Sequence, residues 1–216
     1  MHEEAIFSND EIEWLLYSCN PYINGKSSGS WDYGDGSKNW DYQHRYPYFI
    51  KNIESASGLN PENDNPKVYY EPKKIGDFDA IIDLGSICLK DKLDYSAAKK
   101  VLNDLLNNQL KGSKPLVVKN KHYGSNNFTG MEEYEIQSLR EYCDLISSSR
   151  NYISFMSGGH ALAASLKHWG LKFDQYCIIP EHLTGVDRGD RDGLSFFEFH
   201  IQKGFWVFPE IKYLKY

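Results

Sequence analysis

Residues 152–165 read YISFMSGGHALAAS, which is a short apolar run, then three small residues, then a helix-forming stretch. The apolar run has the length of a buried strand, and the pattern after it predicts a helix over 159–169 that ends at Gly170. A strand that passes into a helix within so few residues is typical of a βα unit in a parallel sheet. This stretch therefore indicates the fold class.

Similar units are expected on both sides of this stretch. Apolar runs predict further strands at 79–84, 115–120 and 175–179. Helical spacing of apolar residues predicts helices over 95–110 and 131–147, and Thr129 with Glu132 fits a capping box at the start of the second. The sequence thus predicts an α/β domain with an open, mostly parallel, Rossmann-like sheet and helices on both faces.

The two ends of the chain differ from this pattern. Residues 197–208 alternate and then turn at Lys203-Gly204, which predicts a β-hairpin. Residues 1–75 are predicted to be an irregular extension and linker, rich in glycine and aromatic residues, with a short helix at 49–57. Residues 76–216 are predicted to be the α/β domain. Trp31 and Trp40 are expected to pack on that domain or on a second copy of the chain.

Charge and composition exclude several classes of protein. The net charge of the 216 residues is −6 and no basic stripe is present, which disfavours nucleic-acid binding. No apolar stretch is long enough to span a membrane. The acidic start, MHEE, does not resemble a signal peptide, and the four cysteines are widely spaced. We therefore expect a cytoplasmic protein with reduced thiols.

The strand-to-helix turn at Ser157-Gly158-Gly159 is the first candidate site. Ligands of such sheets bind beyond the carboxyl ends of the strands, close to helix N-termini. Two glycines allow a ligand to approach the backbone, and the first N–H groups of a helix favour an anion such as a diphosphate. His160 follows directly and joins the candidate set. The alternative is a plain tight turn in which Ser157 only caps the helix.

A second group of candidates follows the strand at 115–120. Lys119 and His122 are positioned there to neutralise phosphate charge, unless they belong to a solvated loop. The predicted ligand-binding residues are thus Ser157, Gly158, Gly159, His160, Lys119 and His122. No catalytic residue is assigned, and no metal or cofactor is expected, because the His and Cys residues lack metal-ligand spacing. The DxD sequence at 77–79 precedes a strand, so we expect it at the opposite end of the sheet.

Residues 116–166 resemble the C-terminal, nucleotide-sugar-binding half of GT-B glycosyltransferases, in particular the heptosyltransferase-like group. The resemblance rests on the strand ending in Lys119, on the YCDLI segment at 142–146, and on Ser157-Gly158-Gly159 followed by LAA at 162–164. It implies that this last turn faces the donor diphosphate. Two positions depart from the family pattern: Met156 stands where an acid is common, and Ala161 stands where histidine is common.

The resemblance implies a glycosyltransferase-like domain that binds a nucleotide sugar. In that family an N-terminal half supplies the acceptor site and the base, and residues 1–75 are too few to form it. The partner expected is therefore a second copy of the chain or a separate N-terminal-half protein. Two alternatives stay open: a non-catalytic binding module of the same fold, or a phosphosugar-binding α/β protein.

Overall fold

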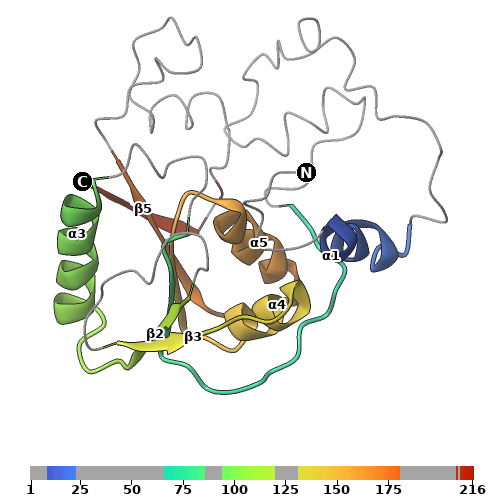
Figure 1. Ribbon diagram of the computed structural model, residues 1–216, viewed down its shortest axis with the longest axis horizontal. Helices are drawn as coiled ribbons and strands as arrows, with labels where there is room; N and C mark the ends of the chain where they lie inside the picture. Colours follow the sequence, from blue (N-terminus) through green and yellow to red (C-terminus); the bar gives the residue numbers. More distant parts are fainter. Residues whose placement is uncertain (1–8, 23–65, 86–93, 120–130, 181–207, 209) are drawn as a thin grey trace, which may run out of the picture.

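The computed structural model describes residues 9–22, 66–85, 94–119, 131–180, 208 and 210–216. Within these residues, six strands form one sheet in the order β3-β2-β1-β4-β5-β6, and every neighbouring pair is parallel (Figure 1). The strands are β1 Ala80–Asp83, β2 Pro115–Val118, β3 Glu132–Tyr134, β4 Asn151–Phe155, β5 Asp174–Ile179 and β6 Ile211–Lys215. The predicted α/β fold is confirmed, and the four predicted strands correspond to β1, β2, β4 and β5.

Helices cover both faces of the sheet. Figure 1 shows α3 on one face and α4 with α5 on the other. The helical elements are α1 Asn9–Glu13, the π-helical turn η1 Trp14–Ser18, α3 Tyr95–Asn108, α4 Leu139–Ser147, α5 Gly158–Leu166 and the 3₁₀ turn η2 Lys167–Trp169. The predicted helix at 159–169 is confirmed as α5 and η2, and Gly170 ends it in the left-handed conformation at φ 75°.

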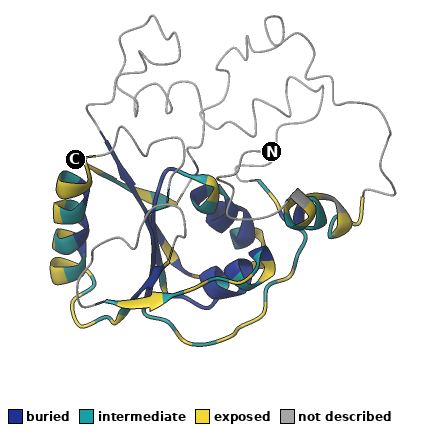
Figure 2. Ribbon diagram, viewed as in Figure 1, coloured by how far each residue is buried: buried dark blue, intermediate teal, exposed yellow. Residues whose placement is uncertain are grey.

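Successive residues of β1 belong to two different apolar cores, because side chains alternate across a strand. Ile82 packs in the core beneath α3, together with Leu102. Ile81 packs in the core beneath α4 and α5, together with Leu145. Figure 2 accordingly shows the centre of the sheet and the inner sides of α4 and α5 as buried. A sheet buried on both faces is what a parallel arrangement requires.

The strand order reverses between β1 and β4. The chain runs outward from β1 through β2 to β3, and then returns to place β4 on the other side of β1. Asp83, at the end of β1, is level with Ser154 of β4. Such a topological switch point is where open α/β sheets bind ligands, outside the carboxyl ends of the two strands. The turn at 157–159 follows β4 directly and lies at this point.

The helix predicted over 131–147 starts too early, and this part of the prediction was wrong. Residues 132–134 form β3, and α4 begins only at Leu139. The true cap is Ser138, whose hydroxyl accepts the N–H of Glu141 at 3.1 Å. Glu132 therefore lies in a strand and not in the first turn of a helix, and Thr129 lies outside the described ranges.

Strands β3 and β6 were not predicted. β3 is a three-residue edge strand that begins with two exposed glutamates, so it lacks the apolar run that signals a strand. β6 has only partly buried and exposed residues, and among the described strands it pairs with β5. The hairpin predicted at 197–208 falls outside the described ranges except for Phe208, as do Trp31, Trp40 and the predicted helix at 49–57; these stay predictions.

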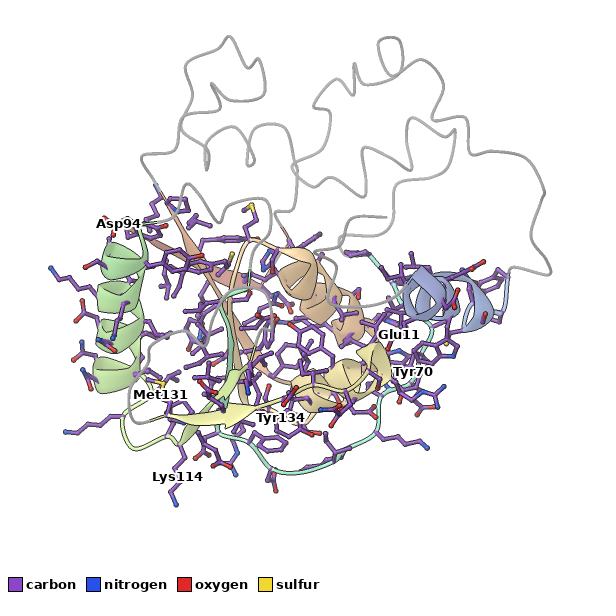
Figure 3. All side chains as sticks on the ribbon, viewed as in Figure 1. Glu11, Tyr70, Asp94, Lys114, Met131 and Tyr134 are labelled. Atoms are coloured by element: carbon purple, nitrogen blue, oxygen red, sulfur yellow. The ribbon has the colours of Figure 1, made fainter. Side chains whose placement is uncertain are left out.

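The described N-terminal segments pack against α4. Leu15 and Val68 are buried in the core beneath α4 and α5. A Glu11 carboxylate oxygen accepts the N–H of Leu139 at 2.8 Å, and Asp144 accepts the hydroxyl of Tyr70 at 2.8 Å. Figure 3 shows the labelled Glu11 and Tyr70 on the side of the molecule where α1 meets α4. The predicted boundary at residue 75 stays a prediction.

Truncation of Leu15 tests whether α1 and η1 belong to the core. Leu15→Ala is expected to lower the free energy of unfolding by about 2–4 kcal/mol, because a buried leucine side chain is lost and leaves a cavity. Leu16→Ala is the matched control: Leu16 is 46% exposed, so the change is expected to stay within about 0.5 kcal/mol. Urea unfolding measures both. Equal effects of the two variants would contradict the packing described for Leu15.

Candidate functional site

The N-terminus of α5 is capped, and none of the described residues obstructs it at Gly158. Ser157 has extended backbone angles, and its hydroxyl accepts the N–H of His160 at 3.4 Å, so it caps the helix as the alternative of a plain tight turn predicted. Gly158, the first helical residue, is exposed, and a β-carbon added there would meet no atom of the described residues within 4 Å. The first N–H groups of a helix have no partner within the helix. At Gly158 they are thus approachable from outside.

Gly159, the next residue, is in very close contact with its surroundings. A β-carbon added there would lie 2.7 Å from the Tyr152 hydroxyl and 2.9 Å from a carboxylate oxygen of Asp83, and closer still to the Tyr142 hydroxyl. Real β-carbons essentially never approach other atoms so closely. Only glycine lets α5 begin at this distance from β1.

The three side chains beneath Gly159 form a buried polar group, which we call the Asp83 cluster: Asp83, Tyr142 and Tyr152. The Tyr142 hydroxyl donates to the Asp83 carboxylate and lies 2.7 Å from the Tyr152 hydroxyl. The other Asp83 oxygen accepts the N–H of Gly85 at 2.9 Å. Asp83 is 6% exposed, Tyr142 4% and Tyr152 0%. The cluster therefore joins β1, α4 and β4 directly below the start of α5.

Burial dominates the electrostatics of the cluster. It raises the pKa of the Asp83 carboxyl above its ordinary 3.8, and the hydrogen bonds from Tyr142 and the Gly85 N–H oppose this only in part. Burial and the neighbouring carboxyl also raise the pKa of both tyrosines well above 10, so that both hydroxyls keep their protons. The cluster thus consists of two protonated hydroxyl groups and a carboxyl group whose ionisation is disfavoured by burial.

Sequence reasoning did not single out this cluster as part of the site. Asp83 ends an otherwise apolar strand at the carboxyl edge, and this acidic position was the available signal. Tyr142 and Tyr152 are indistinguishable by pattern from ordinary core aromatics. Their convergence on Asp83 is visible only in three dimensions.

His160 points away from this cluster. Its ring lies 5.4 Å from the ring of Phe208 and 5.9 Å from that of Tyr213, between α5 and the strands β5 and β6. Gln175 Nε2 lies 3.2 Å from His160 Nδ1 and donates to the His160 carbonyl at 2.9 Å. The side chain is 0% exposed. A direct ligand contact by His160 stays a prediction.

Lys119 lies on the same edge of the sheet but farther from α5. It follows β2, and β1 separates β2 from β4, so about 10 Å lies between the β2 and β4 backbones at two strand spacings. Its ammonium group is half exposed and lies 4.0 Å from the Glu135 carboxylate. His122 is outside the described ranges. The structure therefore brings Ser157, Gly158 and Gly159 together, with Lys119 at the periphery.

The DxD sequence lies at the opposite end of the sheet, as expected. Asp79 directly precedes β1, accepts the N–H of Lys114 at 3.1 Å and pairs with Arg150 at 3.3 Å. Asp77 pairs with Lys74 at 2.8 Å. In the ranges that the structure describes, no group of three or more His, Cys, Asp or Glu side chains is arranged to hold a metal ion. None of the helices there has the length and apolar character needed to cross a membrane.

Comparison with known proteins gives a likeness in structure alone. No family model matches the sequence, and the comparison with curated proteins gives no match. The parallel sheet and its helices are similar in fold to part of a solved heptosyltransferase, in line with the predicted resemblance. The structure that shows this is TibC, a dodecameric iron-containing heptosyltransferase in complex with ADP-D-β-D-heptose.

The two chains match with a TM-score of 0.56 and 17% identity, over 82% of this chain and 50% of TibC. A second TibC structure, from enterotoxigenic E. coli H10407, matches with a TM-score of 0.45 and 19% identity, over 63% of this chain and 37% of that one. The chain thus spans about half the length of TibC.

Adjacent glycines provide a matched test of the close contact beneath α5. Gly159→Ala is expected to lower the free energy of unfolding by about 1–3 kcal/mol, because its β-carbon forces the Asp83 cluster apart. Gly158→Ala is expected to be neutral or to stabilise by up to about 1 kcal/mol, since alanine is the better helix former and open space surrounds the site. Chemical denaturation measures both changes. The contact is refuted if the two variants behave alike.

Replacement of Asp83 by asparagine tests the raised pKa. A native carboxyl that holds its proton to higher pH than the unfolded chain stabilises the fold at low pH, and this stability is lost as pH rises above about 4. Asparagine has no such proton. The free energy of unfolding of the wild type, relative to Asp83→Asn, should therefore fall between pH 4 and pH 7, by at most about 1.4 kcal/mol per pH unit. A relative stability that increases over this range would show that the pKa is lowered instead.

Proposed function

We propose that this chain binds the diphosphate group of a nucleotide sugar at the switch point between β1 and β4, as the donor-binding domain of a glycosyltransferase. One observation carries the proposal: α5 begins at this switch point with Gly158, and no atom of the described residues lies within 4 Å of the place of its missing β-carbon. Backbone N–H groups and the helix dipole at such a position favour a phosphate group. TibC, whose fold is similar, holds ADP-heptose in its structure.

The same groups would assist the transfer reaction. When a sugar leaves its nucleotide, the bond between the anomeric carbon and the diphosphate oxygen breaks, and negative charge develops on the diphosphate. N–H donors already aimed at that charge stabilise the transition state. Gly158 has no side chain to keep the diphosphate away from these donors. Lys119 is proposed to add a positive charge from the β2 side of the site.

A second candidate function is binding without turnover. The chain matches half of TibC, and within the residues that the structure describes we assign no acceptor site and no catalytic base. A donor domain without them binds the nucleotide sugar but neither transfers nor hydrolyses the sugar.

Calorimetry with UDP, GDP, ADP, CMP and the corresponding sugar nucleotides tests the proposal. The wild type should bind at least one of these ligands. Gly158→Asp should abolish binding, because it places a carboxylate at the anion site, whereas Gly158→Ala, the matched control, should retain it. Lys119→Ala should weaken binding by about 1–3 kcal/mol, the range for one charge-assisted contact.

Three outcomes are informative. Binding with sugar transfer supports the enzyme, and binding without transfer or hydrolysis supports the donor domain that needs a partner. The absence of heat with every ligand, in protein shown by circular dichroism to be folded, would refute a nucleotide-sugar site.

A further inference from the structure

The Asp83 cluster contacts both backbone segments that border the proposed site. One Asp83 oxygen accepts the N–H of Gly85, where the chain leaves β1. The other side of the cluster lies against Gly159, at the start of α5. Tyr142 and Tyr152 hold the carboxyl from α4 and β4. A single buried carboxyl thus contacts both segments.

A purely structural role does not require such a group. Burying a carboxyl and two hydroxyls is unfavourable, and apolar side chains of similar volume are often at least as stabilising. What a fully hydrogen-bonded polar cluster adds is one defined geometry. A site that relies on backbone N–H donors needs that geometry, because such donors act over hydrogen-bond distances only.

From this arrangement we infer that Asp83 is a positioning residue of the nucleotide site: held by Tyr142 and Tyr152, it sets the backbone at Gly85 and at the start of α5 for a diphosphate ligand. The inference rests on the proposed function. Asp83 itself lies beneath the glycines and makes no contact with the ligand.

The chain contains a matched control for this role. Tyr70 donates to Asp144, so that α4 takes part in two tyrosine–aspartate hydrogen bonds, one partly buried and one buried. Asp144 also accepts the N–H of Lys73, and the nearby Ser148 accepts the N–H of Ile75. These bonds hold the segment that leads into the amino end of β1. The site lies at the other end of the strands, beyond their carboxyl ends.

The experiment compares Tyr142→Phe with Tyr70→Phe. Affinity is measured by calorimetry with whichever of UDP, GDP, ADP and CMP the wild type binds most tightly, and stability is measured by urea unfolding. Both variants should lose some stability. Tyr142→Phe should weaken nucleotide binding at least tenfold, and Tyr70→Phe less than twofold. Equal losses of affinity in the two variants would overturn the positioning role.

A comparison of a conservative and a non-conservative substitution of Asp83 provides a second test that does not depend on the tyrosines. Asp83→Asn keeps an oxygen for the Gly85 N–H and should bind within threefold of the wild type. Asp83→Leu has the same branching but no hydrogen-bonding atom, and should bind at least tenfold more weakly. Unchanged affinity in a folded Asp83→Leu variant would refute the inference and leave the proposed function intact. A wild type that binds none of the four nucleotides would refute the proposed function, and the inference with it.

Discussion

The close contact between Gly159 and the Asp83 cluster is the constraint on which the rest of the site depends. Because residue 159 has no side chain, α5 can begin directly above the carboxyl end of β1, where the strand order reverses. Any larger residue would push the helix away from the hydroxyls of Tyr142 and Tyr152 and from the Asp83 carboxyl. The same contact brings Gly158 and its open surroundings to the switch point, where α/β sheets bind their ligands.

The fold could be predicted where the sequence carries a strong local signal. The strands β1, β2, β4 and β5 are apolar runs buried on both faces, so their composition alone distinguishes them. The outer strands of the described sheet, β3 and β6, carry no such signal, because their residues are exposed or only partly buried. The capping pattern of Thr129 and Glu132 therefore predicts a helix start where β3 forms, whereas α4 begins after Ser138. Local capping patterns occur by chance, and only the pairing of β3 with β2 decides between the two interpretations.

The position of the glycine turn in the candidate site could be predicted from the sequence, but the side chains that pack beneath it could not. Glycines after a buried strand indicate a close approach, and the structure places Ser157, Gly158 and Gly159 at the switch point. Asp83 and Tyr142 are 59 residues apart, and no periodicity links residues at such a separation. His160 shows that a residue next to the glycines in sequence need not face the same way. It follows them directly, but helix geometry turns its ring toward β5 and β6.

The most direct test of this account is a nuclear magnetic resonance titration that follows each backbone N–H as nucleotide is added. If the start of α5 and the end of β1 form the site, the N–H signals of Gly85, Gly158 and Gly159 should shift the most. Signals of the edge strands β3 and β6 should remain nearly unchanged. The largest shifts at those edges, or the absence of shifts at Gly158 and Gly159 under saturating nucleotide, would contradict the account.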